Sequence, residues 1–234
     1  AVACLLALSL SAQDKKEKPW TEWSKKDAEK ILNDSPWGQT QTATDTSEMF
    51  YSPTGTPTVR PGPTAGQRSV DGATNQAGGV KYHIRFFSAR PVRQALVRSM
   101  MLNMKTQPDA ATMERLKNFA ELQSNESIIL AVTFESTDQR YGNEVMQSFN
   151  SAVTSTLKNT TYLERSDGKR VFLSEYVVPG KDGFGARFIF PRNLDGKPFI
   201  TADASEVRFA SDVASGLNMR FKIAKMSYNG ELEY

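Results

Sequence analysis

The single histidine limits what this chain can do through an imidazole. Its 234 residues include one histidine, His83, and one cysteine, Cys4. Protein zinc sites combine several Cys or His ligands, and a hydrolase elbow needs a Gly-x-Ser-x-Gly sequence that is missing here. Lys81 and Arg85 share the expected solvent-facing side of the His83 strand and should lower its pKa. We therefore interpret His83 as an ordinary strand residue and expect no metal site and no cofactor.

Two carboxylates offer chemistry that needs no histidine. Glu135 and Asp138 stand at the end of the most apolar segment, Ser127 to Glu135. Glycosidases work with carboxylate pairs, so an extracellular carboxylate-dependent hydrolase is one hypothesis. A solvated strand end followed by a turn-forming aspartate explains the same residues without catalysis, and we favour that interpretation.

Arginines and glycines suggest two further sites. Four arginines surround an expected strand-to-helix turn: Arg85, Arg90, Arg93 and Arg98. Such a group could grip an acidic ligand, although scattered arginines at helical spacing favour a solvated face. The glycine-rich segment PGKDGFG (179–185) lies between two expected strands, so we interpret it as a hairpin loop and not as a phosphate cradle.

All three tryptophans lie around one short segment of the chain. Trp20, Trp23 and Trp37 bracket an expected helix that starts at a Ser24/Asp27 capping box. Three exposed indoles could stack on sugar rings or anchor a partner protein. Alternatively they clamp the helix onto the main domain, because a helix this short is marginal alone and each buried aromatic contributes about 2–3 kcal/mol. We favour clamping and keep the three tryptophans as candidate binding residues.

The first residues are typical of export. Residues 1–10 are apolar and uncharged but too short to cross a bilayer, and Ser9 to Ala12 place small residues before a polar stretch that begins at Gln13. We interpret residues 1–12 as the remnant of a signal peptide and expect a periplasmic or extracellular protein. Lipid attachment at Cys4 is a minor alternative, because an apolar run follows it. Cleavage after Ala12 would leave no cysteine, and hence no disulfide.

Composition excludes other classes. The formal net charge is +3 and no run of Lys or Arg exceeds a pair, so we expect no nucleic-acid partner. No later segment is apolar enough for a transmembrane helix.

The pattern of elements predicts an α+β fold. We expect a tryptophan-rich helical segment (13–38), a Thr/Ser/Gly/Pro-rich and largely disordered linker (39–79) and a single globular domain (80–234). Helices dominate the first half of that domain and strands the second. This order predicts a largely antiparallel sheet with about three helices packed on one face.

The segment WTEWSKKDAEKILNDSPW (20–37) resembles a family of exported bacterial proteins of unassigned function. The similarity continues through FSARPVRQA (87–95), FIFPR (188–192) and the closing YNGELEY. It implies export and one shared architecture, and no activity or site comes with it.

Three functions follow as hypotheses. The first is a non-catalytic exported domain that binds an envelope protein or surface polymer, because the usual catalytic motifs are missing and the tryptophans cluster. The second is the carboxylate-dependent hydrolase. The third is an envelope assembly subunit whose Met49-Phe50-Tyr51 segment adds to a neighbouring sheet edge.

Overall fold

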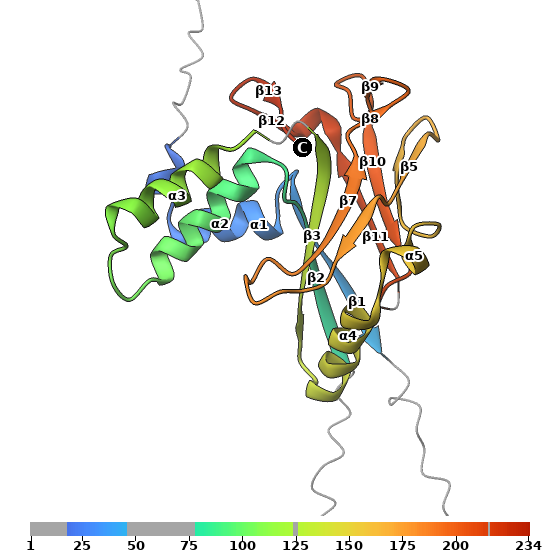
Figure 1. The fold of residues 1–234 in the computed structure, drawn as a ribbon, viewed down its shortest axis with the longest axis horizontal. Coiled ribbons are helices and arrows are strands. Elements are labelled where there is room, and N and C mark those ends of the chain that lie inside the picture. Colours follow the sequence, from blue (N-terminus) through green and yellow to red (C-terminus); the bar gives the residue numbers. More distant parts are fainter. Residues whose placement is uncertain (1–17, 46–77, 124–125, 215) are drawn as a thin grey trace, which may run out of the picture.

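The computed structural model describes residues 18–45, 78–123, 126–214 and 216–234 (Figure 1). The expected signal segment with Cys4, residues 46–77 of the expected linker, and Met49-Phe50-Tyr51 within it lie outside the described residues.

Five α-helices and two short 3-10 helices are present among the described residues. They are η1 (Trp20–Glu22), α1 (Lys25–Asn33), α2 (Arg90–Asn103), α3 (Ala110–Glu121), α4 (Gln139–Ser151), α5 (Thr154–Leu157) and η3 (Ile223–Lys225). The α1 helix begins as the sequence predicts: the Ser24 hydroxyl accepts from the Asp27 amide, and the Asp27 carboxylate accepts from the Ser24 amide.

The strands form two main sheets, and every pairing is antiparallel. The first sheet has the order β1-β2-β3-β7-β6: Gly38–Asp45, Gly78–Phe86, Ser127–Ser136, Ala186–Pro191 and Glu175–Val177. The second has the order β11-β10-β4-β5: Leu217–Lys222, Glu206–Ser211, Tyr162–Arg165 and Arg170–Phe172. Two small hairpins complete the set: β8 (Asn193–Leu194) with β9 (Lys197–Pro198), and β12 (Ser227–Tyr228) with β13 (Glu231–Leu232). The predicted α+β class with antiparallel pairing is confirmed.

Aromatic side chains fill the space between the two sheets. Phe86 of β2 meets Phe221 of β11 edge to face with ring centroids 4.8 Å apart, and Phe188 of β7 meets Phe209 of β10 at 5.2 Å. At one end, α4 closes the core through Phe149 (Figure 1). These rings are almost fully buried, so this layer supplies the main hydrophobic stabilisation.

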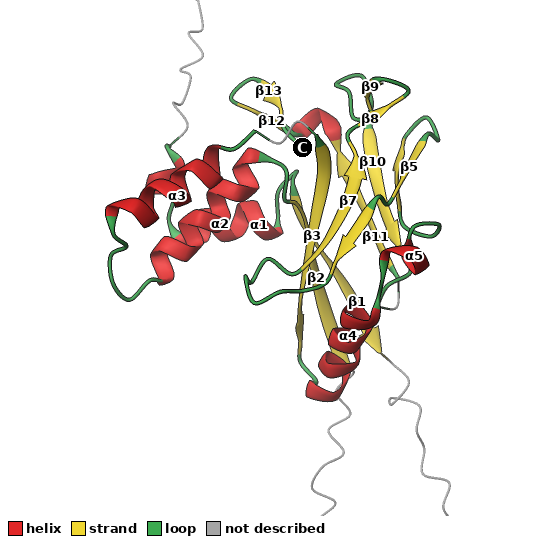
Figure 2. Cartoon of the chain, in the orientation of Figure 1, coloured by secondary structure: helices red, strands yellow, loops and turns green. Residues whose placement is uncertain are grey.

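A helical layer covers the outer face of the first sheet. Figure 2 shows α1, α2 and α3 together on one side of the strands. Arg85 of β2 points toward this layer, where its Nε donates to the Leu32 carbonyl of α1 at 2.9 Å. The N-terminal helix is therefore part of the same folded unit as the sheets.

The predicted linker (39–79) is wrong at both ends, since its first residues belong to β1 and residues 78–79 begin β2. Residues 39–45 belong to β1, which pairs with β2 from Gly38↔Arg85 to Asp45↔Gly78. The outer side of β1 is only half buried, and its Thr-rich sequence therefore shows no apolar alternation that would predict a strand. The segment is a strand because it pairs with β2, which follows far along the chain. The described part of the N-terminal segment, residues 18–38, is consequently joined with the globular domain in one core.

The two sheets meet along both sides. On one side only Leu173 and Ser174 separate β5 of the second sheet from β6 of the first. On the other side β1 and β11 are edge strands, and the Gln41 side chain joins them: its Nε2 donates to the Gly216 carbonyl at 3.0 Å and its Oε1 accepts from the Asn218 amide at 2.8 Å. We refer to this side as the β1–β11 seam.

No helix in the described part of the chain is long and apolar enough to span a membrane.

Candidate binding site

The three tryptophans are packed into the core. Trp20, Trp23 and Trp37 expose only 8%, 7% and 8% of their surface. Most of each indole is therefore covered by the protein, and the prediction of three exposed indoles is corrected. The clamping interpretation is confirmed, since each ring joins the N-terminal segment to the common core.

Each indole N–H has an acceptor within the protein. Trp20 donates to the Glu121 carboxylate of α3 at 2.8 Å, Trp23 to the Lys18 carbonyl at 3.0 Å and Trp37 to the Glu233 carbonyl at 2.8 Å. A buried N–H needs such a partner. The indoles therefore have no donor left for a ligand.

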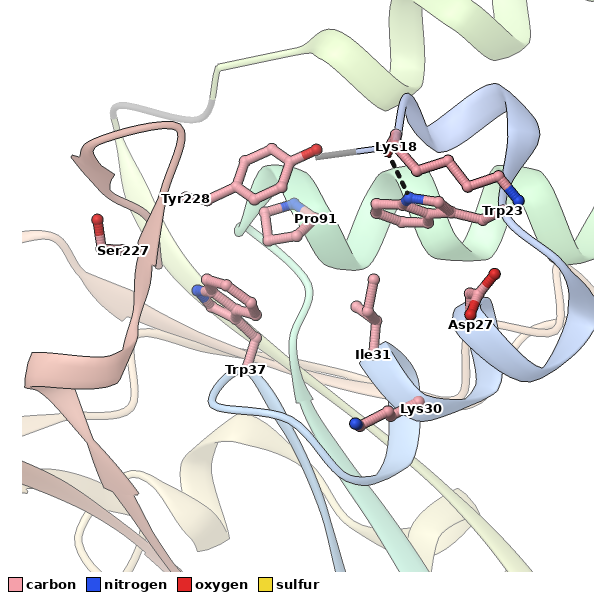
Figure 3. A pocket seen from close by; sticks show the side chains of 9 residues that line it. All are labelled: Lys18, Trp23, Asp27, Lys30, Ile31, Trp37, Pro91, Ser227 and Tyr228. Atoms are coloured by element: carbon pink, nitrogen blue, oxygen red, sulfur yellow. Dashed lines mark hydrogen bonds between the residues drawn. The ribbon is translucent and has the colours of Figure 1, made fainter. Parts of the chain in front are cut away.

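Two of the three tryptophans nevertheless line a pocket. It has a volume of about 360 Å³ and lies between α1, the start of α2 and the β12–β13 hairpin (Figure 3). Its lining consists of Lys18, Trp23, Asp27, Lys30, Ile31, Trp37, Pro91, Ser227 and Tyr228. Trp20 lies elsewhere, against α3. We call this cavity the aromatic pocket.

Ring and aliphatic carbon atoms form most of the aromatic pocket. Trp37 and Tyr228 meet edge to face with centroids 6.1 Å apart, which fixes both rings. Pro91 and Ile31 lie between these rings and Trp23 in Figure 3. Such a surface favours an apolar or planar group.

The polar groups of the pocket are mostly committed. The Asp27 carboxylate accepts from the Ser24 backbone N–H at 2.8 Å, and this bond, followed by that to the Ser24 hydroxyl, holds the pKa of Asp27 below its ordinary value. The Tyr228 hydroxyl donates to Gln94 at 2.7 Å. Neither Lys18 nor Lys30 has an ion-pair partner among the described residues. The pocket therefore offers carbon surface inside and two ammonium groups at its edge.

Pro91, Ile31 and Tyr228 were missed by sequence reasoning. Tyr228 lies in β12, directly before the Asn229-Gly230 turn of the β12–β13 hairpin. No sequence signal places that hairpin against Trp37, because the contact is formed by tertiary packing.

The four arginines are structural residues, contrary to both interpretations of them: Arg85 and Arg93 are buried, and Arg90 and Arg98 are half-buried. Arg93 is 2% exposed and donates to the backbone carbonyls of Ser88 and Leu122. Burial lowers the pKa of Arg93, and it lowers that of Arg85 to about 10. Remaining contacts tie Arg90 to Glu231 and Glu233, and Arg98 to the Trp23 carbonyl. Most N–H donors of the α2 arginines therefore join this helix to neighbouring segments of the chain.

His83 is buried, so the prediction that it faces solvent is wrong. Residues of α1 and β1 cover this side of β2. The Thr40 hydroxyl donates to the Asn33 carbonyl at 3.1 Å and lies within hydrogen-bond distance of His83 Nδ1, at 2.9 Å. Nε2 lies 3.6 Å from Glu135 Oε1 and makes no hydrogen bond within the described structure. Burial, then Arg85, lowers the pKa of His83, in the direction expected from its cationic neighbours.

The candidate catalytic carboxylates have separate structural roles. Asp138 caps the N-terminus of α4, where its side chain accepts from the amides of Arg140 and Tyr141. Glu135 is 76% exposed beside His83. Neither borders the aromatic pocket. The turn-forming interpretation of Asp138 is confirmed in the form of a helix cap.

The glycine-rich segment 179–185 connects β6 to β7, as predicted for a hairpin loop. No group of three or more His, Cys, Asp or Glu side chains suited to a metal ion occurs in the described ranges.

Comparisons with known proteins give little further information. No family model and no curated protein matches the chain. Among solved structures, a protein of unknown function from Burkholderia pseudomallei K96243 is similar over 59% of this chain and 72% of its own, with 9% identity and a TM-score of 0.41. Nothing about function is transferred from it. The resemblance to a family of exported proteins stays a prediction.

Proposed function

We propose that this chain is an exported, non-catalytic recognition domain that binds an apolar ring of a partner polypeptide in the aromatic pocket. The observation that carries the proposal is the chemistry of the pocket: carbon surface from Trp23, Trp37 and Tyr228, whose own indole and hydroxyl hydrogens are already engaged. Export rests on the signal-like residues 1–12.

A polypeptide side chain suits this pocket better than a sugar. A sugar ring carries hydroxyls on all sides, and burying them without partners costs free energy. The indole N–H groups and the Tyr228 hydroxyl donate within the protein, and Oδ2 of Asp27 already accepts two hydrogen bonds from Ser24. An aromatic side chain needs none of these groups. About 360 Å³ is also at the small end of ligand pockets, which span about 300–1,000 Å³.

The lysines at the rim of the aromatic pocket predict that the partner polypeptide has acidic residues next to its anchoring ring. Lys18 and Lys30 form no ion pair within the described ranges, although the charge of Lys18 helps to lower the pKa of Asp27, so a carboxylate on either side of the anchoring ring would meet an ammonium group. Exposed pairs of this kind contribute about 0.2–1 kcal/mol each, and they favour one orientation of the ligand.

The three indole N–H resonances provide the test. We would titrate the protein with N-acetyl-Glu-Phe-Glu-amide and follow the indole signals by NMR. The signals of Trp23 and Trp37 should shift saturably, whereas Trp20, which does not line the pocket, should not. The same peptide with Ala in place of Phe should give much smaller shifts. Equal shifts from methyl β-glucoside, or a shift of Trp20 alone, would contradict the proposal.

A blocking variant adds a second criterion. Ser227 is exposed at the rim, so Ser227→Phe places a ring over the pocket without removing a core side chain. We expect it to weaken binding of the Phe-containing peptide by about tenfold, the effect of 1.4 kcal/mol. The matched control Ser166→Phe, at the exposed β4–β5 turn, should leave binding unchanged.

A further inference from the structure

A second hollow lies at the β1–β11 seam, beside the aromatic pocket. It has a volume of about 700 Å³. The end of α1 and the start of β1 form one wall, with Asn33, Asp34 and Thr40. The end of β11 and η3 form the other, with Arg220, Lys222 and Lys225. We call it the seam groove. The same two stretches of chain, 30–40 and 220–228, also line the aromatic pocket.

The groove is cationic. It has three positive side chains and one carboxylate, that of Asp34. Arg220 is paired with Glu206 at 2.7 Å, but Lys222 and Lys225 are exposed and form no ion pair with any described residue. Two unpaired ammonium groups on one wall attract an anion.

The opposite wall offers neutral donors. Arg85 donates to the Asn33 side chain at 2.7 Å, and a guanidinium can only donate, so the contacted atom is the amide oxygen. The Asn33 amide N–H groups are then left without an acceptor among the described residues. They add hydrogen-bond donors opposite the two lysines.

The backbone on both walls belongs to sheet edges. Among the described strands, β1 pairs only with β2, and β11 only with β10. Between them the Gln41 side chain closes the seam at Gly216 and Asn218, and the groove opens beyond it toward Gln39 and Arg220. An edge strand can add an extended peptide, which gains main-chain hydrogen bonds while side chains set specificity.

We propose that the seam groove binds an extended, acidic segment of a polypeptide. Charge complementarity with Lys222 and Lys225, the Asn33 donors and the two sheet edges together select this ligand. The inference rests on the proposed function in one respect: the acidic segment belongs to the same partner polypeptide that fills the aromatic pocket. The groove itself is defined by other residues than the aromatic pocket.

The test uses a fluorescein-labelled peptide of ten glutamates and fluorescence anisotropy. This probe has no aromatic residue, so its binding does not depend on the aromatic pocket. We expect saturable binding that weakens as salt rises from 0.05 to about 0.3 M, because screening shortens the range of exposed charges to about 10 Å or less. Absence of binding at low salt would overturn the groove proposal, while the Phe-peptide titration above would still decide the pocket.

Charge reversal at the groove should remove the binding. The double variant Lys222→Glu/Lys225→Glu is expected to weaken it at least tenfold. Lys158→Glu/Lys181→Glu makes the same change in net charge at exposed sites outside the groove and should weaken it less than twofold. Equal losses of peptide affinity in both variants would show that binding depends on net charge alone, and would overturn the proposal.

Two alternatives to an acidic peptide are distinguished by further arms. If polyphosphate of matched charge competed more strongly than unlabelled glutamate peptide, the ligand of the groove would be a phosphate polymer and not a polypeptide. Sedimentation of the protein alone would detect a dimer, and a dimer lost on reversal of Lys222 and Lys225 would make the occupant a second copy of this chain. Both results would contradict the inference. Monomeric protein with preferential peptide binding supports it.

Discussion

The indole N–H of Trp37 donates to the backbone carbonyl of Glu233 at 2.8 Å, although 196 positions separate the two residues. The same indole contacts Tyr228 edge to face. The tryptophan-rich segment and the last hairpin are thus joined directly, and together they form a wall of the aromatic pocket. The contacts of Trp37 with the last hairpin therefore both stabilise the fold and shape the proposed recognition site.

Trp37→Phe should lower the free energy of unfolding by about 1–3 kcal/mol. The substitution keeps an aromatic ring but removes the donor, which leaves the Glu233 carbonyl unpaired in a largely buried site. Urea unfolding followed by circular dichroism measures the difference.

Trp20→Phe is the matched comparison, because Trp20 is equally buried. Its acceptor, the Glu121 carboxylate, also receives a hydrogen bond from Gln94 at 3.0 Å. The carboxylate therefore keeps a partner, and we expect a smaller loss than for Trp37→Phe. A larger loss at Trp20 would contradict this account of the two bonds.

Gly185→Ala should destabilise the fold much more than Gly183→Ala. Both glycines have positive φ, 82° and 76°, a conformation that costs an alanine about 1–2 kcal/mol. At Gly183 a Cβ would meet no atom within 4 Å, whereas at Gly185 it would lie 2.2 Å from the Val132 carbonyl oxygen. Gly183→Ala should therefore lower the free energy of unfolding only by the cost of placing an alanine at positive φ. Thermal unfolding of the two variants gives the comparison, and similar midpoints would show that β3 and β7 can separate at low cost.

Stability should fall as the pH drops below 6.5, through His83. Its pKa is lowered in the folded state from an ordinary value of 6.5, chiefly by burial. Above pH 6.5 the imidazole is neutral in both states. Between 6.5 and the lowered pKa, the unfolded chain binds a proton that the folded chain does not, so the free energy of unfolding decreases with falling pH.

Urea midpoints measured between pH 7.5 and 5 check this dependence. His83 is the only histidine in the sequence, so His83→Gln should flatten the change within this range. An unchanged slope in the variant would assign the dependence to other groups.

Asp138→Ala and Glu135→Ala should separate the structural roles of the two carboxylates. Loss of the Asp138 cap removes acceptors for two α4 amides and should cost about 1 kcal/mol. Glu135 is exposed, so its substitution should change stability by less than about 0.5 kcal/mol. Chemical unfolding at pH 7.5, where His83 is neutral, is the measurement. A cost at Glu135 as large as at Asp138 would contradict these roles.

Local patterns in the sequence determined much of the secondary structure. The Ser24/Asp27 capping box placed the start of α1, and the glycine-rich segment 179–185 between two expected strands placed a hairpin loop. These features could be predicted because each depends on residues close together in the chain, through caps, turn conformations and alternation. The α+β class followed from their order.

Only the tertiary structure decided which of these elements meet and what their side chains do. β1 carries no apolar alternation and is a strand because β2 pairs with it. His83 and Arg85 are buried because α1 and β1 cover their side of β2, which no local pattern shows. The aromatic pocket and the seam groove both join residues 30–40 to residues 220–228. Such contacts depend on the packing of distant segments around a shared core, and a single sequence contains no local signal for that packing.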